Sequence, residues 1–474
     1  MDGRRSLSKY REILAEFAER IHRGDLPPGA RLPTERQLAE QRGVNRSTVV
    51  AAYVELQAAG LVERRQGSGT FVRGDLWGLA PDWSRYIMGG AFEPTRPLYQ
   101  RIRAARATSG VIDLSEGILS EELMPRALIE MMLGSLELPP VLGYPQALGD
   151  RRLREVIATQ LYDTHGISAD PESILITDGS QQAIYLITRA LLSPGDAIAI
   201  EQPSYYYALS VFQSSGIRLL PVPMDDDGLD PKAIRPLFQR HRIRLVLTNP
   251  TYHNPTTTTM PVARREELLA ICRTLNIPVV EDDVYGELTI EGTVPPPLKA
   301  LDRENRVLYL GTLSKTGTPA LRLGWIIGPK PVIDRLADVK HQMDFGTNTL
   351  VQWLAAELLI SPGWNEHLRH LRLALRARRD ALIRYLTSLF GSSVSFRRPA
   401  GGLHLWVRWD DSVDDRQRLE AAIKAGVVFA PGRLYGMPDG YARVTYGKVS
   451  EKDIAEGVRR LGKALKNAGH SLGL

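Results

Sequence analysis

Apolar positions near the start of the chain repeat at the spacing of a helix. Between residues 10 and 21 they fall on one face and leave the charged side chains on the other, and they comprise Tyr10, Ile13, Leu14, Phe17, Ala18 and Ile21. This pattern predicts an amphipathic helix. The turn-forming segment GDLPPGARLP at residues 24–33 then ends it.

Two further short helices are expected after this turn. Residues 34–37, Thr-Glu-Arg-Gln, have the form of a capping box, in which the threonine hydroxyl and the glutamine amide satisfy free backbone donors. A second helix is therefore expected over about 35–43. Asn45 is a candidate cap for a third helix, which runs over about 46–59.

A hairpin is expected next. Residues 61–72, LVERRQGSGTFV, contain two short β-prone arms around a Gly-Ser-Gly turn. Two short helices joined by a glycine-containing turn form the shape that places a helix N-terminus in the major groove of DNA, and a hairpin wing can reach phosphates. The alternative is a small helical dimerisation domain with solvated arginines.

The stretch from about residue 7 to residue 72 resembles the GntR-type winged helix-turn-helix. The segments that carry the resemblance are LPTER at 32–36, NRSTV at 45–49 and GSGTFV at 67–72. The resemblance implies that residues 1–74 form a domain that binds double-stranded operator DNA. It assigns the DNA contacts to Arg36, Arg46, Ser47, Thr48, Gly67 and Gly69.

Residues 75–110 separate this domain from the rest of the chain. They include Trp77 and Trp83, whereas flexible tethers normally consist of glycine, serine or charged residues. We expect a partly ordered connector whose tryptophans pack on the remainder of the protein. A disordered tether with exposed aromatic side chains is the alternative.

From about residue 111 onward, short β-branched runs alternate with helical segments. The runs lie at 174–176, 197–200, 245–247, 278–280 and 307–310. Continuous apolar strands separated by helices predict an α/β fold with a mainly parallel sheet covered on both faces. Ligand-binding groups are then expected at the carboxyl ends of the strands.

Polar motifs do follow these strands. A Gly-Ser-Gln turn containing Ser180 opens a helix, and a helix N-terminus of this kind can hold a phosphate. Asn254, Asp282 and Lys315 follow three other strands, and Arg322 lies seven residues beyond the lysine. A lysine after a strand is usually a solvated loop residue, but here it shares one predicted edge with a phosphate cradle, a carboxylate and an amide.

Pyridoxal 5'-phosphate needs this combination of groups: an amine for its aldehyde, a helix N-terminus and a cation for its phosphate, and a carboxylate for its ring nitrogen. From about residue 112 to residue 465 the chain resembles the class I aminotransferases, which have fold type I. The resemblance implies a mainly parallel central sheet and a smaller carboxyl-terminal α/β lobe. We place the body at 111–474, with a large lobe at about 125–340 and a small lobe at about 341–474.

The resemblance also implies a role for each site residue. Lys315 is the catalytic lysine that bonds to the cofactor, Asp282 is the partner of the ring nitrogen, and Tyr205 stacks on the ring. The remaining cofactor contacts fall on the ring hydroxyl and on the phosphate, and their residues are Asn254, Tyr285, Ser180, Gln181, Ser314 and Arg322.

Two further residues take their roles from the same resemblance. Tyr144 matches a tyrosine that a homodimer supplies to the phosphate of the neighbouring subunit. Arg443, in a predicted strand of the small lobe, matches the arginine that grips the carboxylate of a substrate or effector, because a planar guanidinium binds a carboxylate bidentately. Without the resemblance, Arg443 would be interpreted as a surface strand arginine.

One position departs from the family pattern. The usual Asn-Pro-Thr-Gly appears here as Asn-Pro-Thr-Thr, with Thr257 in place of the glycine. A β-branched residue disfavours positive φ, so the shape of this loop is the least secure part of the predicted site.

Composition excludes several classes of protein. The 474 residues suffice for about three domains, and 43% hydrophobic with 24% charged residues is typical of globular proteins. There is no apolar run of the roughly 18 residues needed to cross a bilayer, so we expect a cytoplasmic protein without a membrane partner. The single cysteine, Cys272, excludes an internal disulfide, is expected to be buried, and provides no cluster for a metal.

Charge is concentrated at one end of the chain. Residues 1–74 contain 13 basic and 9 acidic residues, which places +4 of the net +6 in the predicted DNA-binding domain. A small basic domain on a nearly neutral body is typical of a polyanion-binding module attached to something larger.

The two halves together resemble the MocR-type transcriptional regulators. The resemblance implies a homodimeric DNA-binding regulator that senses an amino acid, an amine or pyridoxal phosphate through aldimine exchange at Lys315. An active aminotransferase with an appended DNA-binding domain is the main alternative, because the residues for that chemistry are present. A DNA-binding protein whose body no longer binds cofactor is the third possibility.

Overall fold

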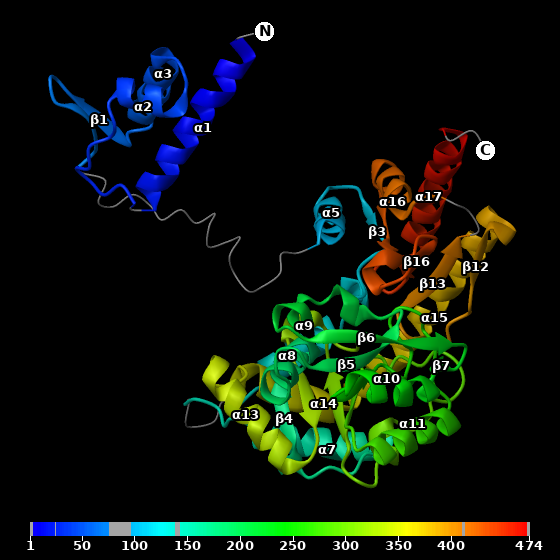
Figure 1. Cartoon of the computed structure of the whole chain (residues 1–474). Coiled ribbons are helices and arrows are strands. Elements are labelled where there is room, and N and C mark those ends of the chain that lie inside the picture. Colours follow the sequence, from blue (N-terminus) through cyan, green and yellow to red (C-terminus); the bar gives the residue numbers. More distant parts are fainter. Residues whose placement is uncertain (1–2, 24, 75–95, 138–142, 410–412, 472–474) are drawn as a thin grey trace. The chain divides into compact units, whose positions relative to one another are not determined.

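The computed structural model describes residues 3–23, 25–74, 96–137, 143–409 and 413–471 (Figure 1). The chain divides into two compact units, Met1–Ala91 and Phe92–Leu474, which we call the head and the body. Trp77 and Trp83 lie outside the described residues, so their packing on the body stays a prediction.

The head contains the three helices and the hairpin expected from the sequence. Its elements are α1 (Gly3–His22), α2 (Glu35–Arg42), α3 (Arg46–Ala58), β1 (Val62–Arg65) and β2 (Gly69–Val72). The antiparallel strands pair Val62 with Val72, and Gly67 in the turn between them has a φ of 75°. A positive φ at this turn suits glycine, which has no Cβ to clash.

The caps of α2 and α3 differ in how they form. The capping box before α2 is present in full, with the Thr34 hydroxyl accepting from the Gln37 backbone and the Gln37 side chain accepting from the Thr34 backbone. Asn45 occupies the N-cap position of α3 as predicted, yet its side chain makes no capping hydrogen bond among the described residues.

The head has its own hydrophobic core. One face of α3, including Val49, Tyr53 and Leu56, is fully buried against Phe17 of α1. The Tyr53 ring meets the Phe17 ring edge to face at 5.9 Å, and its hydroxyl donates to the Pro33 carbonyl over 2.9 Å. The apolar periodicity of the sequence therefore identifies the side of α1 that packs against α3.

The centre of the body is an eight-stranded sheet in the order β4-β11-β10-β9-β8-β5-β6-β7. Only β11 and the short β7 run antiparallel to their neighbours, so the prediction of a mainly parallel sheet is confirmed. The strands are β4 (Ile174–Thr177), β5 (Ala197–Gln202), β6 (Arg218–Asp225), β7 (Gly228–Leu229), β8 (Leu245–Thr248), β9 (Val279–Asp282), β10 (Val307–Thr312) and β11 (Gly324–Ile327).

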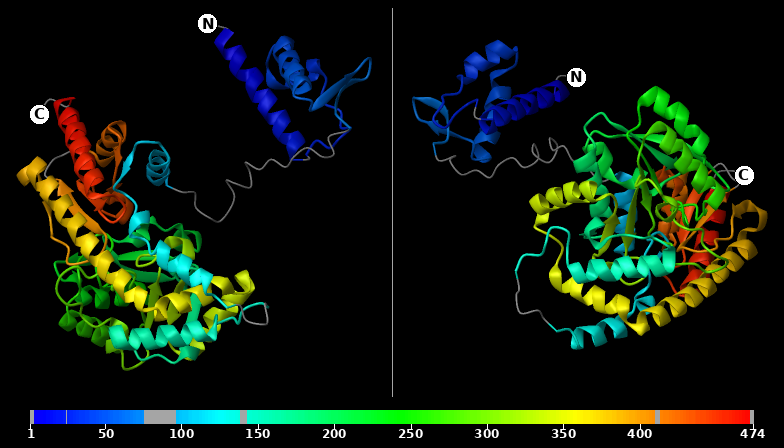
Figure 2. Two further views of the ribbon diagram at one scale, coloured as in Figure 1. Left: turned by 180° about the vertical axis from the view of Figure 1, so that it is seen from behind. Right: turned by 90° about the horizontal axis from the view of Figure 1, so that it is seen from below.

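Helices cover both faces of this sheet (Figures 1 and 2). Alternate strand residues enter opposite cores: Ile198 packs with α8 and α13, whereas Ala199 packs with α10 and α11. Cys272 of α11 is fully buried in the second of these cores, as expected, and burial raises the pKa of its thiol to about 12. The covering helices include α7 (Arg151–His165), α8 (Ser180–Leu191), α10 (Ile234–His241), α11 (Val262–Leu275), α13 (Lys330–Asp344) and α14 (Thr349–Ile360).

A second, smaller sheet forms the carboxyl-terminal lobe. Its order is β12-β13-β16-β15, with bounds Val394–Phe396, His404–Trp409, Tyr441–Thr445 and Ala430–Pro431. Helices α16 (Asp415–Lys424) and α17 (Glu451–Ser471) belong to this lobe, and the long α15 (Pro362–Phe390) runs along the body from the large lobe to it (Figure 2).

An earlier segment of the chain also packs into this lobe. Helix α5 (Pro97–Arg106) lies in the range expected for the connector, yet its Ile102 and Ala105 are buried in the core of the small lobe. The short strand β3 (Ile112–Asp113) pairs in parallel with β14 (Val427–Val428). Within the described residues, therefore, the body begins by residue 97.

The remaining short elements connect these layers. They are α6 (Arg126–Gly134), α9 (Ser210–Ser214), α12 (Leu298–Leu301) and the 3₁₀ turns η1 (Glu121–Leu123), η2 (Pro171–Ser173), η3 (Tyr205–Ala208), η4 (Pro231–Ala233), η5 (Pro319–Leu321), η6 (Gly391–Ser393) and η7 (Gly432–Tyr435). None of the helices in the described part of the chain combines the length and apolar character needed to cross a bilayer.

Candidate functional site

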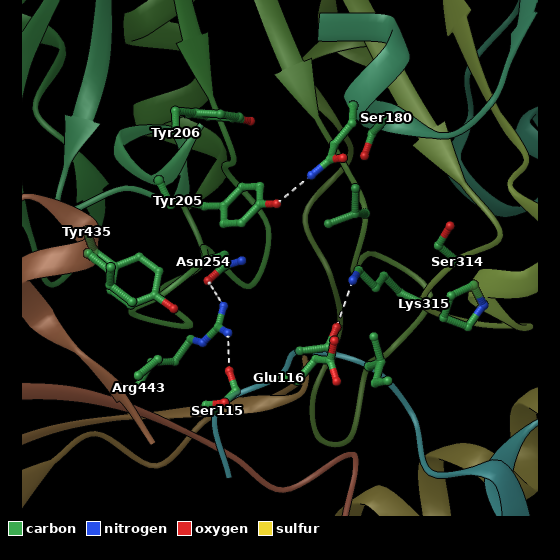
Figure 3. A pocket seen from close by; sticks show the side chains of 18 of the residues that line it. Ser115, Glu116, Ser180, Tyr205, Tyr206, Asn254, Ser314, Lys315, Tyr435 and Arg443 are labelled. Atoms are coloured by element: carbon green, nitrogen blue, oxygen red, sulfur yellow. Dashed lines mark hydrogen bonds between the residues drawn. The ribbon is translucent and has the colours of Figure 1, made fainter. Parts of the chain in front are cut away.

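A pocket of about 340 Å³ lies where the carboxyl ends of the parallel strands meet the small lobe (Figure 3). Ten of the eleven cofactor and effector residues predicted from the sequence line it, from five separate segments of the large lobe and one strand of the small lobe. They are Ser180, Gln181, Tyr205, Asn254, Asp282, Tyr285, Ser314, Lys315, Arg322 and Arg443.

Lys315 projects into this pocket three residues after β10 ends. Its Nζ donates to the Gly117 carbonyl over 2.7 Å. A Cβ on Gly117 would lie 2.6 Å from His404 Cε1, so only glycine allows this carbonyl its position. Burial, with the nearby Arg443 charge, lowers the pKa of Lys315 to about 8, which makes a neutral, nucleophilic amine accessible near physiological pH.

Asp282 is the last residue of β9 and its carboxylate is half satisfied. Oδ2 accepts from the Tyr206 hydroxyl over 2.8 Å, whereas Oδ1 is buried and has no hydrogen-bond partner among the described residues. Burial raises the pKa of Asp282 to about 6, although the Tyr206 hydrogen bond opposes this. A buried carboxylate oxygen without a partner is costly, so it favours a ligand with a positively charged N–H.

Asn249, which the sequence analysis did not single out, joins the ends of β8 and β9. Its side-chain nitrogen donates to the Asp282 carbonyl over 2.6 Å, and its side-chain oxygen accepts from the Asn254 backbone over 2.7 Å. The buried Glu201 carboxylate in turn accepts from the Asn249 backbone over 2.9 Å. Asn249 directly follows β8 and Tyr206 lies near the end of β5. A position just after a strand was therefore the sequence signal that could have identified both as site residues.

The predicted phosphate cradle is formed at the start of α8. Gly179 has a φ of 87°, and α8 begins at the next residue, Ser180, which lines the pocket together with Gln181. The backbone N–H groups of the first turn of a helix have no partner within the helix and can bind an anion. The Arg322 guanidinium donates to the Asp178 carbonyl over 2.8 Å, and a Cβ on Gly179 would lie 3.0 Å from it. An exposed cation and a helix N-terminus therefore meet at one point, which suits a phosphate.

Arg443 enters the pocket from β16 of the small lobe and contacts the large lobe (Figure 3). Its guanidinium donates to Asn254 Oδ1 over 2.9 Å and to the Ser115 carbonyl over 2.6 Å, and it lies over the Tyr435 ring. Its side chain is 6% exposed, and Nε has no partner among the described residues. The guanidinium is thus preorganised for an anion, and it is not the surface arginine of the alternative interpretation.

Two tyrosines that line the pocket, Tyr285 and Tyr205, hydrogen-bond to neighbouring side chains. The Tyr285 hydroxyl lies 3.3 Å from the Asn254 side-chain nitrogen and 3.1 Å from His404 Nε2. Burial and the nearby cations lower the pKa of His404 well below its usual value, so its ring is neutral at physiological pH. The Tyr205 hydroxyl accepts from the Gln181 amide over 3.0 Å, which orients the Tyr205 ring in the pocket.

Helix α5 supplies a wall that the sequence analysis missed, because this segment had been placed in the connector. Tyr99, Ile102 and Arg106 lie on one face of α5 and line the pocket. Arg106 is paired with Glu116 at 3.2 Å, and Lys448 pairs with the same carboxylate. The charges of Arg106 and Glu116 in the pocket lining are therefore paired with one another, and Lys315 and Arg443 are the other basic groups in the described part of the chain that, with Arg322, line the pocket.

Tyr144 is the one predicted cofactor residue that does not line the pocket. It is 86% exposed, and its ring lies 5.5 Å from the ring of Phe345, which is also exposed. A single chain therefore does not bring this tyrosine to the other ten residues.

The head contains a second hollow, a groove of about 500 Å³ between α2, α3 and the hairpin. Four of the predicted DNA contacts line it, namely Arg36, Arg46, Gly67 and Gly69. Ser47 is exposed beside it, but the Thr48 side chain is only 6% exposed and lies in the interior of the head. Thr48 lies on the buried face of α3 and therefore offers little surface to DNA. The residue type alone did not indicate that this threonine is buried.

Comparison with known proteins agrees with this geometry. Residues 109–461 match the family of class I and II aminotransferases, and residues 9–72 match the gntR family of bacterial regulatory proteins. The chain belongs to the class I and II aminotransferase family. It carries a GntR-type helix-turn-helix domain at its amino end, which is the arrangement of the MocR-type regulators.

Relatives that span nearly the whole chain are named as regulators. The uncharacterized HTH-type transcriptional regulator YdfD of Bacillus subtilis is 38% identical over 98% of this chain and 97% of its own length. The HTH-type transcriptional regulator NorG of Staphylococcus aureus is 26% identical over 91% of this chain and 98% of its own. Both are therefore similar to this chain in the head as well as in the body.

Solved structures match the body of this MocR-type protein. Kynurenine aminotransferase from Pyrococcus horikoshii, solved in complex with PMP, is 31% identical, with a TM-score of 0.75, over 79% of this chain and 95% of its own. LysN, the α-aminoadipate aminotransferase of Thermus thermophilus, is 31% identical, with a TM-score of 0.73, over 81% of this chain and 98% of its own. The predicted fold type I is thereby confirmed.

The loop that departs from the family pattern keeps a backbone suited to glycine. Thr257 has a φ of 60°, and its backbone nitrogen donates to the His253 carbonyl over 2.6 Å. The left-handed region costs a residue with a Cβ about 1–2 kcal/mol. The threonine therefore leaves the turn intact and is held there under strain by its surroundings, where it is 6% exposed.

This strain predicts a difference between two truncations of the same side chain. Thr257→Gly and Thr257→Ala both remove the hydroxyl and the methyl group, but only alanine retains the Cβ that disfavours positive φ. We expect the glycine variant to have the larger free energy of unfolding, by about 1 kcal/mol, in chemical denaturation of the cofactor-free protein. Equal stability of the two variants would show that the loop is not strained at this position.

Proposed function

We propose that this protein is a transcriptional regulator that binds operator DNA through its head and senses an amino acid or amine through pyridoxal phosphate bound in its body. The observation that carries the proposal is the joining of two sites in one chain: an arginine-lined groove in a GntR-type head and a pocket with an amine, a half-satisfied carboxylate and an anion cradle. The relatives that match both halves are named as regulators.

The pocket fits pyridoxal phosphate at three independent points. The unpartnered Asp282 oxygen suits the protonated ring nitrogen, the start of α8 with Arg322 suits the phosphate, and the Lys315 amine suits the aldehyde. The Tyr205 ring and the Asn254–Tyr285 pair would contact the face and the hydroxyl of the ring. When bound, the cofactor supplies an aldehyde that captures amines and a ring that withdraws electrons.

Lys315 and Arg443 would divide the recognition of an amino acid between them. The lowered pKa of Lys315 allows its amine to bond covalently and to be released again in exchange for another amine. Arg443 presents a planar guanidinium to the carboxylate, supported by the Tyr435 ring. An amine without a carboxylate would use only the first of these interactions.

The position of Arg443 also suggests how the ligand is sensed. Its guanidinium, on the small lobe, donates to Asn254 on the large lobe, so a carboxylate that takes over this donor exchanges a contact between lobes for a contact with ligand. A ligand shifts a conformational equilibrium when it binds two states with different affinity. We infer that the ligand changes this contact between the lobes and that the change alters DNA binding by the head.

An aminotransferase that also binds DNA is the second candidate, because the same residues would serve that reaction. The aromatic-amino-acid aminotransferase 1 of Thermococcus litoralis is 32% identical over 81% of this chain. That similarity covers the body, whereas the regulators match the head as well. The regulator function is therefore favoured over the aminotransferase function.

The pKa of Lys315 predicts the pH dependence of cofactor capture. The amine reacts only when neutral, so below about pH 8 the rate of pyridoxal phosphate attachment to cofactor-free protein should rise about tenfold per pH unit, and above it the rate should level off. Visible absorbance in stopped flow measures this rate. Lys315→Ala should abolish attachment and spare DNA binding, while Lys330→Ala, at an exposed lysine paired with Asp334, is the matched control.

A pH-independent rate would contradict the assignment of Lys315 as the reacting amine. Loss of both attachment and DNA binding in Lys315→Ala would show instead that the lysine is needed for the fold.

We further propose that two chains form a homodimer in which Tyr144 completes the phosphate site of the partner. The support is that Tyr144, which is 86% exposed, packs against the exposed Phe345, and that Met343 and Leu350, close to Phe345 in the sequence, are exposed as well. Light scattering should give the mass of two chains at micromolar concentration, and Tyr144→Ala should weaken cofactor binding. A monomer with full cofactor affinity would contradict this arrangement.

The exposed Arg46 at the start of α3 generates a prediction for DNA. If its guanidinium contacts a base, Arg46→Ala should weaken binding to the preferred DNA by about 1–3 kcal/mol and relax the sequence preference at one position. A contact to phosphate would instead weaken all sequences equally and reduce the salt dependence. Arg20→Ala, which removes an exposed arginine of α1 outside the groove, is the control; equal affinities for both variants would remove Arg46 from the interface.

A further inference from the structure

The groove of the head contains one charge of the wrong sign for DNA. Four arginines line it, Arg36, Arg46, Arg64 and Arg65, and Glu35 is the only acid among the described residues that do. A carboxylate beside phosphates lowers affinity, because it cancels part of the charge that releases counterions. Its presence in the lining of this groove therefore calls for a compensating role.

Glu35 uses both of its oxygens to hold arginines from two different elements. Oε2 accepts from Arg46 at the start of α3, over 3.1 Å from Nη2 and 3.3 Å from Nε. Oε1 accepts from Arg64 on strand β1, over 2.7 Å. One carboxylate thus ties the first turn of the helix to the hairpin wing.

The carboxylate is itself held in place. Glu35 is the first residue of α2, directly after the capping box formed by Thr34 and Gln37, so its backbone is fixed by hydrogen bonds that do not involve its side chain. Its side chain is 20% exposed, whereas that of Arg46 is 72% exposed. The glutamate is the inner anchor and the arginine reaches outward from it.

We propose that Glu35 is a positioning residue for DNA recognition, which orients Arg46 and Arg64 and thereby provides sequence discrimination at the expense of nonspecific affinity. The inference rests on the proposed DNA binding by the head. An arginine side chain has many rotamers, and holding it in one geometry before binding reduces the ordering needed in the complex. Exposed ion pairs contribute little to folding, so this arrangement is better explained by recognition than by stability.

Glu63 provides a matched control within the same wing. It accepts from Arg65, two residues away on the same strand, over 2.9 Å and 2.7 Å, and therefore joins no separate elements. Glu63→Gln removes the same charge from the head as Glu35→Gln. The two variants differ in whether the lost carboxylate holds α3 to the hairpin.

The experiment uses the full chain and two DNA probes. The first probe is the duplex that the wild-type protein enriches from a random-sequence library, and the second is a scrambled duplex of the same composition. Fluorescence anisotropy gives the affinity for each, and their ratio measures discrimination. Thermal melting checks that both glutamine variants remain folded, as expected from the intact capping box before α2.

Both glutamine variants should bind the scrambled duplex a few-fold more tightly, because each removes a negative charge near the phosphates. Glu35→Gln alone should lower the ratio of the two affinities, by about tenfold, the amount associated with one well-placed arginine–base contact. Equal ratios for Glu35→Gln and Glu63→Gln would overturn the positioning role.

Arg46→Ala separates this inference from the proposed function. If Arg46→Ala also leaves binding of both probes unchanged, the groove is not the DNA interface and the proposed function of these head residues fails. If Arg46→Ala weakens binding while Glu35→Gln behaves like Glu63→Gln, the DNA interface stands and only the positioning role is wrong.

Discussion

The buried carboxylate of Asp282, with one oxygen satisfied and one without a partner, is the constraint on which the body depends. It lies at the end of β9, is held by the Tyr206 hydroxyl, and its backbone is tied through Asn249 to Asn254 in the loop that follows β8. Such an arrangement is costly unless a ligand supplies the missing donor. The parallel sheet brings these strand ends to one edge and leaves there a buried carboxylate oxygen that suits a ligand with a protonated nitrogen.

The same pocket connects the two lobes, and this is what makes the body suitable as a sensor. Arg443 reaches from the small lobe to Asn254 on the large lobe, and α5, whose side chains line the pocket, is packed into the core of the small lobe. In the proposed mechanism, a ligand that takes over the Arg443 donor to Asn254 alters this contact between the lobes. The head contains its own arginine-lined groove, in which Glu35 restrains two of the arginines.

Much of this could be predicted from the sequence, because the signals are local. Apolar runs followed by polar motifs located five strands and part of the pocket, and the resemblance to the class I aminotransferases supplied the rest of the ten pocket residues. Periodicity, the capping box and the Gly-Ser-Gly turn located the helices and the wing of the head. Contacts between distant segments could not be predicted in this way, because they depend on packing. Examples are the hydrogen bond from Tyr206 to Asp282, the burial of α5 in the core of the small lobe, and the ion pairs of Glu35 with two arginines. The burial of Thr48 was missed for the same reason, since neighbouring positions of one helix face opposite environments.

The most direct test of the account is whether the ligand state of the pocket changes the affinity of the head for DNA. The full chain, loaded with pyridoxal phosphate, is titrated with its preferred duplex in the presence and absence of each member of a panel of amino acids and amines, beside Lys315→Ala. We predict that at least one compound that alters the visible absorbance also changes DNA affinity by about fivefold or more in the wild-type protein and leaves the variant unchanged. Absorbance changes without any change in DNA affinity would contradict the account.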